Sequence, residues 1–180
     1  MTKNNSVQKL VLSAFFLALC MLLPMITAHV PLVGNMLCPM HLPVLLCGLL
    51  CGWQYGALVG FVAPLLRSAL FGMPPIFPTA IAMAFELCTY GLVIGLIFMA
   101  IKKQNIAGVY TAMIPAMLCG RLVWAIVRVI LAGMSGSAFT WEMFISGAFT
   151  TAIPGIIVQL VFIPLIMAAL NRAGVVKLRA

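Results

Sequence analysis

Uncharged apolar segments make up most of the chain, and turn-forming residues divide them into stretches of helix length. Between Leu10 and Leu66 there is no Asp, Glu, Lys or Arg. A helix needs about 20 apolar residues to cross a bilayer, so this stretch is too long for one span. Proline, glycine and polar clusters indicate the loops, and a tight turn is expected at residues 53–55. The predicted helices cover residues 8–28, 40–52, 54–71, 79–101, 106–133 and 141–171.

Basic residues are distributed unevenly between these predicted helices. If the N-terminus is cytoplasmic, the inner segments contain Lys3, Lys9, Lys102, Lys103, Arg172, Lys177 and Arg179. The three outer loops, 29–40, 72–78 and 134–140, then contain no Lys or Arg. Membrane proteins concentrate these residues in their cytoplasmic loops. The pattern predicts an all-α integral membrane protein, one membrane domain over residues 1–180, with six transmembrane helices and both termini inside.

Composition identifies lipid as the main solvent of this chain. Of its 180 residues 65% are hydrophobic and 7% are charged, whereas a soluble domain carries about 25% charged residues. The net charge of +8 would suggest nucleic-acid binding in a soluble protein. Here the basic residues lie mainly between apolar segments, so membrane topology explains them and no nucleic-acid partner is expected. No small-residue cleavage site follows the first apolar segment, which we therefore interpret as a permanent span.

Motifs for catalysis and for metal binding are absent or incomplete. The chain has no G-x-x-x-x-G-K-[ST] motif, so it cannot hydrolyse ATP through a P-loop. Cys47 and Cys51 have no His or carboxylate beside them, and neither a metal site nor a disulfide framework is expected. Residues 133–136, GMSG, match the G-x-S-G pattern of rhomboid-type proteases, but the only histidines, His29 and His41, precede it instead of following on a later helix. We expect no enzymatic activity and no cofactor.

Small residues recur every four positions in four of the predicted helices. This spacing lets helix backbones approach closely. The first group runs through the second helix, the turn and the third helix, where we expect it to seat these two helices against each other. The second group lies in the fourth helix, and an A-x-x-x-A pair lies in the first. The residues are Gly48, Gly52, Gly56 and Gly60, then Gly91 and Gly95, and finally Ala14 and Ala18.

Apart from Lys9 and Glu142, which lie at helix ends, four charged side chains fall inside predicted helices: Arg67, Glu86, Arg121 and Arg128. Each would cost about 2.5–3.5 kcal/mol near the bilayer centre, so each must face the protein interior or water. At about 1.5 Å per residue, three of them lie about 8–10 Å below the outer ends of their helices, and Arg121 lies deeper. A cavity open to the outside would explain the three at similar depth.

Polar and aromatic neighbours complete a candidate small-molecule pocket. Trp124 shares a helical face with Arg121 and Arg128, and Tyr90 shares one with Glu86. Aromatic walls with a few directed polar groups are typical of ligand sites. Near the same outer edge lie three further residues, Asn35, His41 and Trp141. One polar residue, Gln159, lies within the sixth helix.

Structural interpretations of the same residues remain open. Glu86 could pair with Arg67 or Arg128 and lock the bundle. Arg121 could instead satisfy backbone carbonyls at a helix break near Pro115. His41 could simply begin a helix, and Tyr90 and the tryptophans could be packing residues or interfacial anchors.

The chain resembles the substrate-binding S components of energy-coupling factor (ECF) vitamin transporters. The resemblance covers essentially the whole chain. It is carried by the six-span plan in about 180 residues, by the Ala14 and Ala18 pair, and by the segment HLPVLLCGLLCGWQYGALVGFVAPLLRSALFGMPPIFPTAIAMAFELCTYG. In that segment a short helix with proline and glycine leads into a G-x-x-x-G hairpin and then an outer loop.

The resemblance implies the substrate-binding subunit of an ABC importer in a bacterial plasma membrane. Such a subunit captures a vitamin or precursor from outside and is thought to topple in the bilayer to release it inside. Ala14 and Ala18 would contact a transmembrane scaffold subunit, which carries two cytoplasmic ATPases. The first and third outer loops would cover the pocket. Its residues would be Glu86, Tyr90, Trp124, Arg128 and Gln159.

Two questions about the solute stay open at this level. Three arginines against one glutamate favour an anionic ligand such as pantothenate or niacin, because a guanidinium binds a carboxylate in bidentate fashion. A neutral ligand such as pyridoxine also fits if Glu86 pairs with an arginine. The alternative function is a stand-alone secondary carrier or channel for a small anionic solute, which would usually contain inverted repeats. We see no clear internal repeat.

Overall fold

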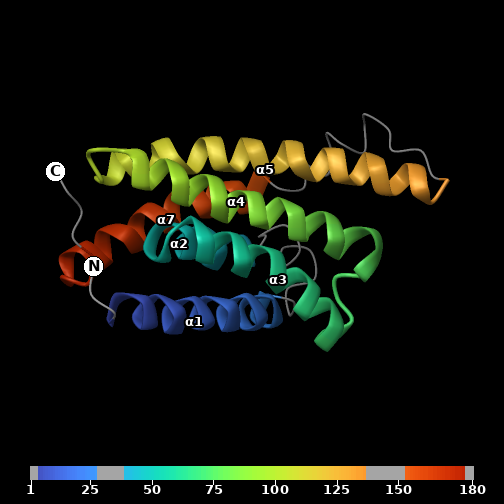
Figure 1. Cartoon of the computed structure of the whole chain (residues 1–180), viewed down its shortest axis with the longest axis horizontal. Coiled ribbons are helices and arrows are strands. Elements are labelled where there is room, and N and C mark those ends of the chain that lie inside the picture. The colour runs from blue at the N-terminus through green and yellow to red at the C-terminus, as the bar shows by residue number, and fades with distance from the viewer. Residues whose placement is uncertain (1–3, 28–38, 137–152, 177–180) are drawn as a thin grey trace.

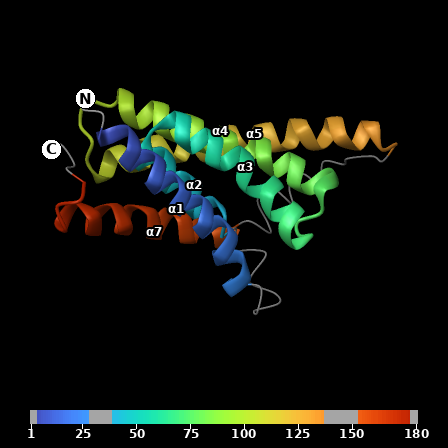
Figure 2. The same cartoon turned by 60° about the horizontal axis from the view of Figure 1, so that its bottom comes forward.

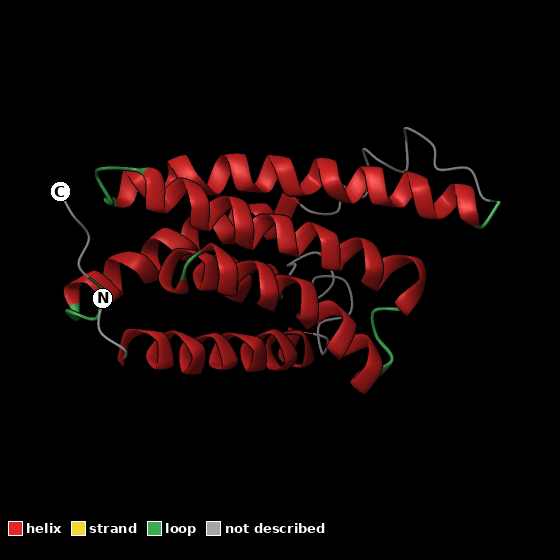
Figure 3. Cartoon of the chain, in the orientation of Figure 1, coloured by secondary structure: helices red, strands yellow, loops and turns green. Residues whose placement is uncertain are grey.

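The computed structural model describes residues 4–27, 39–136 and 153–176, and these form helices joined by short loops (Figures 1 and 3). No strand occurs within these three ranges. The all-α prediction is therefore confirmed for the described part of the chain. The elements are α1 (Asn4–Thr27), α2 (His41–Cys51), α3 (Trp53–Phe71), the short η1 (Ile76–Ala80), α4 (Ile81–Ala100), α5 (Ile106–Met134) and α7 (Ile153–Arg172).

Five helical segments of the described chain are long and apolar enough to cross a membrane. They are α1, α3, η1 together with α4, α5 and α7. The sixth predicted span, α2, has 11 residues and a length of about 16 Å, roughly half the hydrocarbon thickness. Residues 141–152 of the predicted last helix lie outside the described ranges. A multi-pass membrane protein is thus supported, while six spans stay a prediction.

The helices pack as one bundle with α4 between α3 and α5 (Figure 1). One end of this bundle contains the start of α1, the end of α7 and the α4–α5 turn. That end includes Lys9, the exposed Lys102 and Lys103, and Arg172. These positions fit the predicted cytoplasmic side, although the N-in/C-in orientation itself remains a prediction. At the opposite end α5 continues past the other helices in both views (Figures 1 and 2).

Helix α2 is buried inside the bundle and does not face lipid. Nine of its eleven residues are buried, and it contacts α1, α3, α4 and α7. It runs parallel to α4, because Gly48 packs on Gly91 while His41 reaches Glu86. A helix enclosed by protein in this way can be shorter than a span, because protein instead of lipid surrounds its polar ends.

The junction between α2 and α3 is shorter than the sequence suggested. Only Gly52 interrupts the two helices, with φ 97° and ψ 171°, and α3 already begins at Trp53. The predicted turn at Trp53, Gln54 and Tyr55 is therefore wrong. A glycine can adopt positive φ without steric cost, so a single residue suffices to reverse the chain.

Glycines hold α2, α3 and α4 in backbone contact. A Cβ atom added to Gly56 would lie 2.7 Å from the Cα of Gly48 and 2.8 Å from the carbonyl oxygen of Gly91. A Cβ atom on Gly60 would overlap the Leu87 carbonyl, and one on Gly95 would lie 2.5 Å from the Trp53 backbone. The expected seating of α2 against α3 is confirmed, and α4 joins them at the same point.

Candidate functional site

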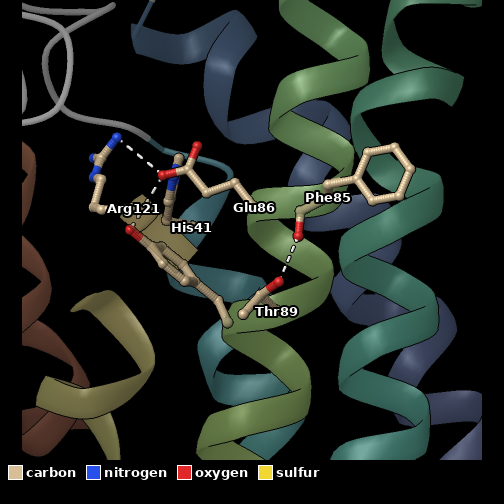
Figure 4. Close-up of polar contacts among 6 residues, drawn as sticks. His41, Phe85, Glu86, Thr89 and Arg121 are labelled. Atoms are coloured by element: carbon tan, nitrogen blue, oxygen red, sulfur yellow. Dashed lines mark hydrogen bonds and ion pairs between the residues drawn. The ribbon is translucent and has the colours of Figure 1, made fainter. Parts of the chain in front are cut away.

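Glu86, in the second turn of α4, is the centre of a buried polar cluster. Glu86 is only 1% exposed. Its Oε1 atom lies 2.9 Å from Nη1 of Arg121 on α5 and 3.6 Å from Nε2 of His41 on α2. The Tyr90 hydroxyl, one turn further along α4, donates a hydrogen bond to the same oxygen at 3.2 Å. Figure 4 shows the Arg121 and His41 side chains pointing at one carboxylate oxygen of Glu86, so that α2, α4 and α5 each contribute to the cluster.

The position of the Tyr90 ring depends on Gly120. A Cβ atom on Gly120 would overlap the Tyr90 ring, so only glycine leaves room for the ring between α4 and α5. The ring also makes an edge-to-face contact with His41, with centroids 5.3 Å apart. Sequence reasoning missed Gly120. Its only signal was a glycine directly before Arg121, within an apolar helix.

The pairing of Glu86 with Arg121 neutralises a charge that would otherwise be costly. Arg121 is 8% exposed, so both partners have lost most of their water. Removing one partner of such a pair leaves an uncompensated charge and destabilises a protein by about 3–5 kcal/mol. Glu86 pairs with Arg121, so the alternative pairings of Glu86 with Arg67 or Arg128 are wrong. Arg121 has a carboxylate partner in addition to any backbone carbonyl near Pro115.

Arg121 reaches Glu86 because α5, the longest of the described helices, extends beyond α4. The depth estimate assumed that all helices end at one level, and it placed Arg121 deeper than Glu86. Helix α5 instead extends outward beyond α4. Arg121 lies 13 residues, or about 20 Å, from the end of α5, and Glu86 lies five residues, or about 8 Å, from the start of α4. Arg121 and Glu86 are nevertheless side by side, and Arg128 lies about 10 Å further out than Arg121 on α5. Arg128 and Glu86 are therefore at different depths, and the predicted common level of Arg67, Glu86 and Arg128 is wrong.

Arg67 has a separate structural contact at the α1–α3 interface. Its Nη1 donates a hydrogen bond to the carbonyl oxygen of Met21 at 2.8 Å, and its guanidinium lies 5.3 Å from the Phe71 ring centroid. Pro24 disrupts the hydrogen-bond ladder of α1 in this turn. Arg67 therefore connects α1 to α3 and is not drawn into the Glu86 cluster.

Arg128 and Trp124 form a second pair on the outward extension of α5. The Arg128 guanidinium lies 5.7 Å from the Trp124 ring centroid, and both residues are half-buried. Arg128 follows Arg121 by seven residues, which places it about 10 Å further out on the same helical face. The expected shared face is thus retained, with Arg121 at the cluster and Arg128 nearer the outer end.

Gln159 lies in the inner part of the bundle. It is 1% exposed on α7, and neither atom of its amide group has a hydrogen-bond partner. The carbonyl of the next residue, Leu160, accepts a hydrogen bond from the Tyr110 hydroxyl at 3.0 Å. Tyr110 precedes Arg121 by eleven residues, or about 16 Å along α5. The structure does not bring Gln159 to Glu86.

The remaining residues that the sequence predicted to be functional are either exposed on α1 or lie outside the described part of the chain. Ala14 and Ala18 are exposed on α1, beside the exposed apolar side chains of Leu10, Phe15 and Leu22. Asn35 and Trp141, with most of the first and third outer loops, lie outside the described residues. Within the described ranges no group of three or more His, Cys, Asp or Glu is placed to hold a metal ion.

Comparison with known families supplies the class of protein. The family model for the ECF transporter, substrate-specific component, matches residues 8–167. Searches of curated proteins and of solved structures find no match. The matched range contains almost all of the described helices and every residue of the Glu86 cluster. The chain is therefore a multi-pass membrane protein that belongs to the family of substrate-specific, substrate-binding components of ECF transporters.

Proposed function

We propose that this chain captures a small water-soluble vitamin or vitamin precursor outside a bacterial cell and delivers it to the cytoplasm. The single observation that carries the location of the site is the convergence of Arg121, His41 and Tyr90 on one oxygen of Glu86. Polar groups inside a membrane protein are expensive and mark substrate pathways by default. An apolar cluster of similar volume would pack the bundle equally well, so packing alone does not require these side chains.

The proposed site opens toward the outer side of the membrane. His41 is at the outer end of the half-length helix α2, and Arg128 with Trp124 lies about 10 Å further out along α5. The cluster would form the base of the site and the Arg128–Trp124 pair its wall. Arg67 is left out of this proposal because it bonds Met21 on another interface. Gln159 is left out because it lies in the inner part of the bundle, next to the Leu160 carbonyl that Tyr110 binds.

A co-purifying solute provides the direct test of this function. Purified protein is examined by native mass spectrometry, and the Glu86→Gln variant is compared with wild type. We expect wild type to carry a small molecule, and the variant to lose at least about nine-tenths of it, because a hydrogen bond to a charged group contributes about 1.5–3 kcal/mol. The matched control is Thr89→Val, since Thr89 bonds the Phe85 carbonyl on the other side of α4 (Figure 4).

Two results would contradict the proposal. One is a wild-type protein that carries no solute after gentle extraction from cells grown in rich medium. The other is a solute held equally well by wild type and by Glu86→Gln. A double variant, Glu86→Gln with Arg121→Gln, leaves no unpaired buried charge and separates loss of binding from loss of folding.

The proposed energising partner is a transmembrane scaffold subunit with two ATPases. The exposed pair of Ala14 and Ala18 lets another helix approach α1 closely, and larger apolar side chains surround it. We expect Ala14→Leu with Ala18→Leu to abolish co-purification of a co-expressed scaffold while solute binding stays within about two-fold of wild type. Val7→Leu, on the exposed face nearer the start of α1, is the control. A complex that survives the double substitution would place the contact elsewhere.

A further inference from the structure

The charges at the base of the site cancel, which changes the class of ligand that it accepts. Arg121 is paired with Glu86 at 2.9 Å, and Arg67 is hydrogen-bonded to Met21 on another interface. The excess of arginines in the sequence therefore does not create an anion site at Glu86. A carboxylate that took Arg121 for itself would leave Glu86 as a buried charge beside a second negative group, which both desolvation and repulsion oppose.

The polar atoms that remain for a ligand include both donors and acceptors. The contacts of Glu86 described above fall on Oε1. His41 Nε2 lies 3.6 Å from that oxygen, beyond hydrogen-bond distance, and both His41 nitrogens are buried without a hydrogen-bond partner. Arg121 is paired through Nη1, but its Nε atom makes no hydrogen bond. A buried polar atom without a partner is unfavourable until a hydrogen-bonding group reaches it, and a hydroxyl group can both donate and accept.

Aromatic surfaces restrict the size of what can approach these groups. The Tyr90 ring is held against Gly120 and meets His41 edge to face. Tyr90 and His41 are 1% and 2% exposed, so packed rings flank the carboxylate and favour a small group such as a hydroxyl or an amino group there.

We propose that the ligand is uncharged at the end that reaches Glu86 and presents a hydroxyl or amino hydrogen there. This inference rests on the function proposed above and narrows its substrate class. Any negative group of the same ligand would lie at the outer end, near Arg128, about 10 Å away along α5.

Matched pairs of probes test this inference on the purified full chain in detergent. The pairs are pyridoxine with 4-pyridoxate, nicotinamide with nicotinate, and panthenol with pantothenate. In each pair a hydroxyl or amide replaces a carboxylate on the same skeleton. Affinities are measured by isothermal titration calorimetry, and any co-purified molecule is identified by liquid chromatography with mass spectrometry.

We expect the uncharged member of any pair that binds to bind at least about ten-fold more tightly than its carboxylate. Glu86→Gln with Arg121→Gln should weaken that uncharged probe by at least about ten-fold, and Thr89→Val should leave it unchanged. His41→Phe, which keeps an aromatic ring but removes both unpartnered nitrogens, should weaken it by about five-fold or more.

Four outcomes would overturn the inference. Tighter binding of the carboxylate members would do so and leave the proposed function standing, as would a co-purified molecule whose only polar groups are carboxylate or phosphate. Neutral probes unaffected by the double variant would show that they bind elsewhere. If no probe binds and no molecule co-purifies, the proposed function fails and the inference fails with it.

Discussion

The inner and outer parts of the bundle are held together by opposite kinds of contact. In the inner part α2, α3 and α4 meet through Gly48, Gly56 and Gly91, where their backbone atoms come into direct contact. In the outer part α2, α4 and α5 meet through charged and aromatic side chains around Glu86. Close backbone contact tolerates almost no added atom, whereas a polar cluster tolerates replacement of one partner by another of the same chemistry. The inner part is thus suited to fixing the helices, and the outer part to exchanging partners with a solute.

The strongest test of this difference is Gly91→Ala in the inner part. The added Cβ would overlap the Gly56 carbonyl, and neither helix can move away without breaking contact with α2. We expect a loss of about 3 kcal/mol or more in the free energy of unfolding, at the upper end of what overpacking costs. Thermal unfolding in detergent measures it. Gly133→Ala is the matched control because a Cβ there meets no atom within 4 Å. Equal melting temperatures for the two variants would mean that the glycine junction is not tight.

The next test compares two buried arginines with different partners. Arg121→Gln leaves the Glu86 carboxylate unpaired and should cost about 3–5 kcal/mol. Arg67→Gln loses one hydrogen bond to a neutral carbonyl and should cost about 1.5–3 kcal/mol. Denaturant or thermal unfolding of the purified variants gives both values.

A second substitution checks the assignment of Arg121. Adding Glu86→Gln to Arg121→Gln should recover at least half of the lost stability, because no buried charge remains. A larger loss from Arg67→Gln than from Arg121→Gln would reverse the roles of the two residues.

The smallest expected effect on stability, and the most selective effect on binding, comes from Gly120→Ala. The added Cβ displaces the Tyr90 ring, whose hydroxyl donates to Glu86. We expect about ten-fold weaker solute binding, equivalent to about 1.4 kcal/mol, with a smaller fall in melting temperature than for Gly91→Ala. Tyr90→Phe should reproduce part of this loss, since it removes the same hydrogen bond. Unchanged affinity in both variants would show that the Tyr90 hydroxyl plays no part in the site.

The sequence predicted the helices well because their signals are local. Long uncharged stretches and proline-rich or glycine-rich loops fixed the ends of α3 and α5 to within about two residues. The turn before α3 was placed too late. Trp53, Gln54 and Tyr55 read as a polar break, but Gly52 alone reverses the chain and those residues form the first helical turn.

The members of the site could be identified in part, but their pairing could not. Glu86 and Tyr90 are four residues apart on one helix, so their contact followed from helical geometry. The choice of Arg121 over Arg67 or Arg128 depends on how far α5 extends beyond α4, which no local pattern reveals. Gly120 escaped notice for a related reason. A glycine opposite a large ring on another helix can be recognised only when both helices are in place.

The single-residue link at Gly52 has a consequence for how the protein can move. With α2, α3 and α4 interlocked, His41, Glu86 and Tyr90 belong to one rigid block, and tilting of the chain in the bilayer would leave their spacing unaltered. Release of a solute would then depend on α5, which supplies Arg121 and the Gly120 position against the Tyr90 ring. A shift of this single helix by about 1–2 Å would separate Arg121 from Glu86 and free the Tyr90 ring in the same motion.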